Sequence, residues 1–165
     1  MFYEEVLRKL NKEEIRYLVV GGIALNLHGV PRTTMDLDLM VDLSKKNLSK
    51  LTNVLKSLGY EPKTPNKAAD LLDEEKRKMW IRDKNMLAFC FIDPKKPYKQ
   101  VDIFIDNPID FEKADQARND INAEGLVLPL ISLDNLIQLK EKSSRKQDIS
   151  DVEALKQIKE IENNE

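Results

Sequence analysis

The chain has 165 residues, a formal net charge of -2 and 41% hydrophobic residues, a composition typical of one ordinary folded domain rather than of a disordered protein. A chain of this length can bury a core without covalent staples, and its single cysteine, Cys90, excludes an intramolecular disulfide and a zinc finger. The slightly acidic balance argues against a protein that coats nucleic acid non-specifically. Because we find neither a signal-peptide pattern nor a membrane-spanning apolar segment, we expect a cytoplasmic protein without membrane contact.

Hydrophobic periodicity predicts the elements of the N-terminal part of the chain. Apolar residues at helical spacing, short β-branched runs and an alternation of acidic and apolar residues follow one another, and glycines mark the turns. We predict a helix over Phe2–Asn11, a buried strand over Ile15–Val20 ending at Gly21-Gly22, a short helix over Ile23–Leu27, a strand over Asp36–Val41 and a helix from the N-cap Ser44 to Leu58.

The remainder of the chain also alternates between predicted helices and strands, and it ends in helices. We predict a charged helix over Ala68–Trp80, strands over Met86–Ile92 and Lys99–Ile105 joined by the loop Asp93–Pro97, a helix over Phe111–Arg118, a small hairpin or two short strands within Ile121–Leu128, and helices from Ser132 to Lys142 and over Ile149–Ile161. This order predicts an α/β (α+β) fold with a mixed β-sheet flanked by helices. Residues 1–130 would form the core, and residues 131–165 a helical appendage packed on it as part of one compact unit.

Three aspartates stand in strands where apolar residues are expected. Side chains two residues apart in a strand share a face, so Asp36 and Asp38 project together while Leu37 faces the core. Asp102 interrupts the apolar segment Val101–Ile105 and needs a partner in the sheet. A neighbouring strand that carries Asp36 and Asp38 would bring all three acids together.

Grouped carboxylates repel each other unless a cation lies between them. An all-oxygen ligand set with a phosphate substrate favours Mg²⁺, with Mn²⁺ as a possible substitute. Asp106 is in register with Asp102 but lies at the predicted strand end, where capping of a turn before Pro108 explains it better. For Asp102 the alternative role is a structural salt bridge, to Lys99 or Lys140.

The ordered combination resembles the nucleotidyltransferase superfamily that includes DNA polymerase β. Its signature is a hydrophobic strand, Gly-Gly or Gly-Ser, a spacer and Asp-x-Asp. Here the signature is Val19-Val20-Gly21-Gly22, 13 intervening residues, Asp36-Leu37-Asp38 and the later Asp102. Further similarity, to the minimal branch near the AbiEii-type abortive-infection toxins, lies in His28-Gly29-Val30-Pro31-Arg32-Thr33-Thr34 before the acidic pair and in Leu136–Lys140 and Arg145–Val152 after it.

The resemblance implies a role for each matching residue. Asp36, Asp38 and Asp102 would hold two cations and carry the catalysis. Gly21 and Gly22 would let backbone N–H groups approach a phosphate, although a plain strand-to-helix turn is the alternative. Further nucleotide contacts would come from the loop and the C-terminal helices, namely Arg32, Thr33, Lys140 and Asp148, with Asp148 orienting Lys140.

Structural explanations remain open for several of these residues. Arg32 can be an ordinary surface arginine, and Thr33 can satisfy loop backbone groups. Lys140 lies beside an apolar stripe and can extend its ammonium to water. Asp148 and Asp151 are acids in the first turn of a helix, where the helix dipole favours them. The segment 56–100 carries eleven Lys/Arg against seven Asp/Glu, and is either a solvated surface or a basic wall beside the acids.

We therefore predict a Mg²⁺-dependent, ATP- or other NTP-binding enzyme that transfers a nucleoside monophosphate to an acceptor hydroxyl and releases pyrophosphate. The toxin-like resemblance favours RNA or protein as acceptor and a possible antitoxin partner. Two alternatives remain: a catalytically silent nucleotide-binding or interaction module, and an enzyme that modifies small molecules such as antibiotics. The short chain argues against the latter, because such enzymes usually need more surface for the acceptor.

Overall fold

The fold is built around one seven-stranded mixed sheet, seen in a computed structural model that describes residues 2–143 and 145–165. The strand order is β3-β4-β5-β2-β1-β7-β6. Neighbours pair antiparallel except β2 with β5 and β1 with β7, which are parallel. The strands are β1 Tyr17–Val20, β2 Leu37–Val41, β3 Glu61–Pro62, β4 Ala88–Asp93, β5 Lys96–Phe104, β6 Asn119–Ala123 and β7 Leu126–Leu130.

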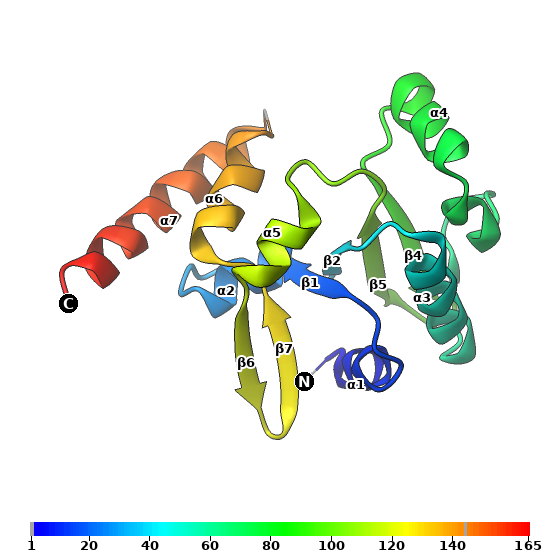
Figure 1. Ribbon diagram of the computed structural model, residues 1–165, viewed down its shortest axis with the longest axis horizontal. Coiled ribbons are helices and arrows are strands. Elements are labelled where there is room, and N and C mark those ends of the chain that lie inside the picture. Colours follow the sequence, from blue (N-terminus) through cyan, green and yellow to red (C-terminus); the bar gives the residue numbers. More distant parts are fainter. Residues whose placement is uncertain (1, 144) are drawn as a thin grey trace.

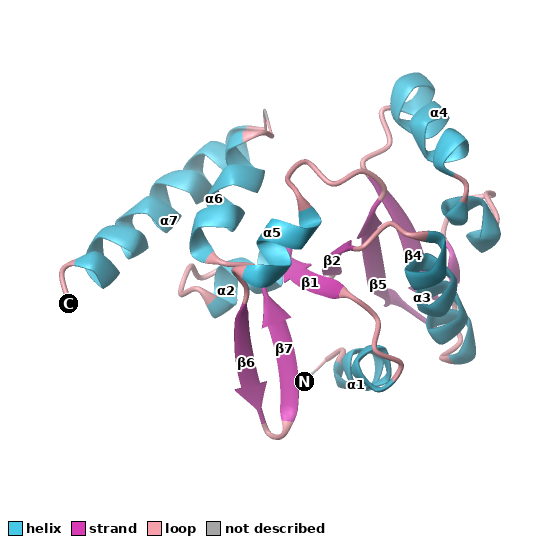
Figure 2. Cartoon of the chain, viewed as in Figure 1, coloured by secondary structure: helices cyan, strands magenta, loops and turns pink. Residues whose placement is uncertain are grey.

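Helices flank this sheet. Figure 1 shows the C-terminal helices α6 (Leu133–Glu141) and α7 (Lys146–Asn163) at the opposite end of the molecule from α4 (Glu74–Lys84). Figure 2 shows the same arrangement with helices and strands distinguished by colour. The helices are α1 Glu4–Lys12, α2 Gly21–Leu27, α3 Lys45–Ser57, the 3₁₀ helix η1 Ala68–Leu72, α4 Glu74–Lys84, α5 Phe111–Gln116, α6 Leu133–Glu141 and α7 Lys146–Asn163. No helix in the described part of the chain is both long and apolar enough to span a bilayer.

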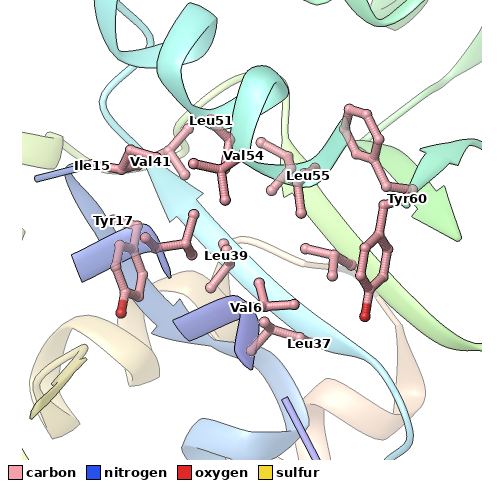
Figure 3. Close-up of a cluster of buried hydrophobic side chains, with 14 of the residues drawn as sticks. Val6, Ile15, Tyr17, Leu37, Leu39, Val41, Leu51, Val54, Leu55 and Tyr60 are labelled. Carbon is pink, nitrogen blue, oxygen red and sulfur yellow. The ribbon is translucent and has the colours of Figure 1, made fainter. Parts of the chain in front are cut away.

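One face of the sheet is closed by α1 and α3. The alternation predicted for β2 places Leu37, Leu39 and Val41 in this core, all fully or almost fully buried. In Figure 3 the α3 side chains Leu51, Val54 and Leu55 lie over them, with Val6 of α1 alongside. The apolar stripe of α3 begins at the predicted place, because Ser44 caps the helix by accepting the backbone N–H of Asn47.

The opposite face is covered by α2, α5, α6 and α7. Its core contains Leu18 of β1, Met40 of β2, Leu136 of α6 and Leu155 of α7. Since Met40 lies two residues after Asp38, this is the face toward which Asp38 also projects. The α/β (α+β) fold, with a mixed sheet and two C-terminal helices, is therefore as predicted.

The middle of the chain departs from the prediction in three places. The helix expected over Ala68–Trp80 is divided into η1 and α4, because Asp73 has an extended backbone and caps α4 by accepting the N–H groups of Glu75 and Lys76. The two-residue strand β3 was not predicted. The β4–β5 hairpin is tighter than the predicted loop, since Asp93 already pairs with Lys96, with a bulge between Ile92 and Asp93.

Candidate active site

The sheet brings the three predicted acids together. Asp38 of β2 and Asp102 of β5 are directly opposite each other in the parallel ladder, and Asp36 lies one residue before β2. Residues paired in this way project to the same face of a sheet. The aspartates are therefore neighbours on the α2, α6 and α7 face, although 64 positions separate Asp38 from Asp102 in the sequence.

The glycine pair packs directly on these acids and their loop. Gly21 has a φ of +67°, and a Cβ on it would lie 2.1 Å from Oδ2 of Asp38. A Cβ on Gly22 would lie 2.7 Å from the Cβ of Thr34. Any side chain at Gly21 would both strain the backbone and displace the Asp38 carboxylate. Both glycines are therefore required by close packing, and Gly21 is required by its backbone conformation as well.

Positive charge from Lys63 and Lys140 compensates the acidic cluster only in part. Burial, then the charges of Asp102 and Asp36, raise the pKa of Asp38 to about 7, against smaller opposing effects of a backbone hydrogen bond from Gly22 and the charge of Lys140. Burial and the charge of Asp102 also raise the pKa of Asp36. The arrangement thus disfavours three simultaneous negative charges in the absence of a cation.

Sequence reasoning missed the residue that holds Asp102. The side-chain amide of Gln100 donates to both carboxylate oxygens of Asp102, at 2.9 and 3.1 Å, and its own Oε1 accepts from the Lys63 ammonium at 3.0 Å. Gln100 lies two residues before Asp102 on the same strand, so the period of two was a usable signal. In the described part of the chain no lysine or arginine forms an ion pair with Asp102, contrary to the salt-bridge alternative.

The donor set fits a divalent cation, although it is not already closed around one. Within residues 2–143 and 145–165, no three His, Cys, Asp or Glu side chains are preassembled as a metal site. The three aspartates nevertheless offer only oxygen ligands, the type that Mg²⁺ and Mn²⁺ prefer. Burial first, and then the charges of Asp102 and Asp36, raise the pKa of Asp38, and a bound cation would favour its ionised form.

A second charged cluster joins the loop before β2 to the C-terminal helices. The Lys140 ammonium is 3.1 Å from Asp148 and 3.2 Å from Asp151, and Arg32 pairs with Asp151 as well. Asp148 also accepts from the Ser143 hydroxyl and from Arg145 Nε. Burial acts to raise the pKa of Asp148, but the hydrogen bonds from Ser143, Arg145 and Lys140 outweigh it and the pKa is lowered.

This geometry answers two of the structural alternatives. Lys140 is buried and paired, so it does not simply extend its ammonium into water. Arg32 is likewise held by Asp151 and is only partly exposed. From the sequence we assigned Asp151 only an interaction with the helix dipole. In the structure its carboxylate pairs with both Arg32 and Lys140. Thr33 is exposed in the loop that leads to Asp36.

Comparison with known proteins gives similarity in structure alone. No protein-family profile and no curated protein sequence matches the chain. Among solved structures, the lincosamide antibiotic adenylyltransferase LnuA bound to lincomycin is similar, with a TM-score of 0.58, 16% identity and 93% coverage of both chains. ANT(2'')-Ia in complex with adenylyl-2''-tobramycin has a TM-score of 0.55 at 14% identity, covering 92% of this chain and 83% of its own. The candidate nucleotidyltransferase TM1012 of Thermotoga maritima has a TM-score of 0.54 at 15% identity, covering 97% of this chain and 89% of its own.

These similarities extend over 92 to 97% of the chain. At 14 to 16% identity they establish shared architecture and not shared chemistry. The sheet that pairs Asp38 with Asp102, with a Gly-Gly turn against Asp38, is therefore built on the fold of the nucleotidyltransferases.

Proposed function

We propose that this protein transfers a nucleoside monophosphate from an NTP to an acceptor hydroxyl. The observation that carries the proposal is the pairing of Asp38 with Asp102 across two parallel strands, with Asp36 beside them and Gly21 packed on the Asp38 carboxylate. A structural salt-bridge network would not leave three acids together with a charge excess. A site for cations and a polyphosphate accounts for that excess.

Each acid has a role in this proposal. Asp36, Asp38 and Asp102 would hold divalent cations, Mg²⁺ or Mn²⁺, which when bound would neutralise the triphosphate and lower the pKa of the acceptor hydroxyl. Asp102 accepts the proton of that hydroxyl. The hydroxyl oxygen then forms a bond to the α-phosphorus while the bond from that phosphorus to the bridging oxygen breaks, and pyrophosphate leaves.

The remaining predicted contacts lie around the triphosphate. The Gly21 and Gly22 backbone can approach a phosphate closely because neither residue carries a side chain. Arg32 and Lys140 provide positive charge for the phosphate oxygens, Asp148 orients Lys140 through their hydrogen bond, and Thr33 contacts the nucleotide from the loop. Phosphate binding would compete with Asp151 for Arg32 and Lys140, since all three groups are already paired.

The acceptor we favour is an RNA end or a protein side chain, in a toxin-like enzyme that an antitoxin partner would restrain. A small-molecule acceptor is the second candidate, and one observation favours it. The chain covers 93% of LnuA, so it is as large as an enzyme whose acceptor is an antibiotic. Chain length therefore does not argue against antibiotic modification.

Pyrophosphate release in the presence of Mg²⁺ and each of the four NTPs tests the activity. Acceptors would be a pool of short RNAs, a mixture of peptides and a panel of lincosamides and aminoglycosides. We expect Asp38→Asn and Asp102→Asn to lower the rate at least ~100-fold, which is about 2.7 kcal/mol of lost transition-state stabilisation. Asp106→Asn is the matched control, since Asp106 is exposed just beyond the end of the same strand.

The control variant should retain the wild-type rate. Equal rates in wild type, Asp38→Asn and Asp102→Asn would refute the proposal. Nucleotide binding without pyrophosphate release, across every acceptor class, would favour a catalytically silent binding module. Transfer to an antibiotic alone would favour the second candidate.

A further inference from the structure

An exposed group of aromatic and apolar side chains lies beside the candidate active site. Phe2 is 47% exposed, and Met35 and Tyr98 are each 52% exposed. The rings of Phe2 and Tyr98 are 5.6 Å apart between centroids, in a tilted arrangement. Single exposed apolar residues are common, but two exposed rings in contact, with the exposed Met35 linked to them through Tyr3, indicate a binding site.

Tyr3 connects this group to the acids. Its ring contacts Phe2 edge-on, with centroids 5.3 Å apart, and its hydroxyl lies 2.5 Å from the carbonyl oxygen of Met35. The same hydroxyl accepts the backbone N–H of Gln100 at 3.0 Å, and the Gln100 side chain in turn holds Asp102. Met35 also directly precedes Asp36. The exposed rings are therefore anchored to the segments that carry the acids.

The border of the group is basic. The Lys99 ammonium lies 5.4 Å from the centroid of the Phe2 ring. Lys95 and Lys96 are exposed at the β4–β5 hairpin that leads to Tyr98. The Lys63 ammonium donates to the side chain of Gln100, which in turn holds Asp102. These positive charges complement a phosphodiester backbone, and the exposed rings complement unstacked bases.

We propose that Phe2, Met35 and Tyr98, with Lys95, Lys96 and Lys99, form a docking surface for single-stranded RNA whose end is the acceptor. A base stacks on Tyr98 and the phosphates contact the lysines, which directs the terminal hydroxyl toward Asp102. A duplex fits less well, because its paired bases do not expose their faces to a protein ring. This inference rests on the proposed function and names its acceptor.

Binding of a fluorescein-labelled single-stranded RNA of about twelve nucleotides tests the surface, measured by anisotropy without NTP or Mg²⁺. We expect Tyr98→Ala to weaken binding roughly tenfold, the lower range of the effect of losing one base–aromatic stack, whereas Tyr98→Phe retains the ring and binds like wild type. Leu87→Ala is the matched control, since Leu87 is 74% exposed and lies before β4. It should leave RNA affinity unchanged.

The lysines are tested through salt dependence. Lys96→Gln should weaken RNA binding and reduce the slope of log affinity against log salt, because fewer counterions are released. Lys46→Gln, at an exposed position on α3, should alter neither quantity. Circular dichroism of each variant checks that the fold is retained.

Several outcomes would overturn the docking surface. These are no RNA binding by the wild type, equal RNA affinity in Tyr98→Ala, or a loss confined to NTP affinity, which would assign the ring to the base of the nucleotide substrate. Transfer to a peptide or an antibiotic at rates unaffected by Tyr98→Ala would also refute the docking surface. The proposed nucleotidyl transfer would then still stand. RNA binding that follows the variants, with no pyrophosphate release, would refute the proposed function and leave the surface standing.

Discussion

Two clusters of buried or half-buried charge lie close together in this molecule and differ in how their charges are balanced. In the acidic cluster, Asp36, Asp38 and Asp102 face one another, and the pKa of Asp38 is raised to about 7. In the C-terminal cluster, defined by Arg32, Lys140, Asp148 and Asp151, each carboxylate has a cationic partner and the pKa of Asp148 is lowered. Lys140 acts on both, since its charge also lowers the pKa of Asp38.

The difference indicates that the acidic cluster is suited to bind a cation, whereas the C-terminal cluster stabilises the fold. Paired buried charges destabilise a protein strongly when one partner is removed, because the other is left without compensation. Where like charges are held together, neutralising one of them stabilises the protein instead, since it relieves repulsion. Stability measurements on single variants can therefore distinguish the two clusters independently of any activity.

Asp148→Ala should have the largest effect. It leaves Lys140 with Asp151 alone and removes the acceptor of Ser143 and Arg145, so we expect the free energy of unfolding to fall by about 3 to 5 kcal/mol in urea denaturation. Asp134→Ala, which breaks an exposed pair with Lys159, should change it by less than about 1 kcal/mol. Equal effects of the two substitutions would show that burial does not set the C-terminal cluster apart.

Gly21→Ala should cause the second-largest loss of stability. The left-handed backbone alone disfavours alanine by about 1 to 2 kcal/mol, and the added Cβ must displace the Asp38 carboxylate. Gly59→Ala is the matched control, because Gly59 has a φ of +86° with no atom near the added Cβ. We expect the Gly21 variant to lose more stability than the control and also any pyrophosphate release; equal losses of stability would contradict close packing on Asp38.

Asp38→Asn should raise the stability of the protein rather than lower it. Between about pH 4 and pH 7 the unfolded aspartate is ionised while the folded one retains its proton, so this residue lowers wild-type stability as the pH rises. Asparagine does not titrate. Without divalent cations, the variant should exceed the wild type at pH 8 by about 1 kcal/mol or more and by less at pH 4.

Urea denaturation across this pH range measures the difference, with Asp106→Asn as the exposed control. Parallel stability curves for wild type and Asp38→Asn would contradict the charge excess assigned to the acidic cluster. Addition of Mg²⁺ at pH 8 should raise the stability of the wild type more than that of the variant, since only the wild type retains the full set of carboxylates.

Ser143→Ala should have the smallest effect. It removes one of several donors to Asp148 and leaves Lys140 in place, so a loss of about 1 kcal/mol is expected in the same denaturation assay. Ser150→Ala, at an exposed position of α7, should be close to neutral. A loss as large as that of Asp148→Ala would mean that the hydroxyl, rather than the ammonium, compensates the buried carboxylate.

The sequence alone was sufficient for most of the fold because its strongest signals are local. The alternation Leu37, Leu39, Val41 predicted one buried face of β2, and Ser44 and Ser132 marked helix starts that the structure confirms. Local signals were weaker where charge dominates. In residues 68–80 the apolar periodicity did not reveal that Asp73 would cap a new helix, and a two-residue strand such as β3 has too few residues to form a pattern.

For the candidate site, the sequence by itself determined which residue types stand where: acids on two strands, a Gly-Gly turn and a loop arginine. Only the tertiary structure decided their partners, because β2–β5 register, the packing of α7 and the position of Phe2 depend on contacts between distant segments. Thus Gln100 holds Asp102, Asp151 bridges Arg32 and Lys140, and Phe2 meets Tyr98. Such pairings arise from burial and geometry, which a periodic pattern along one segment does not encode.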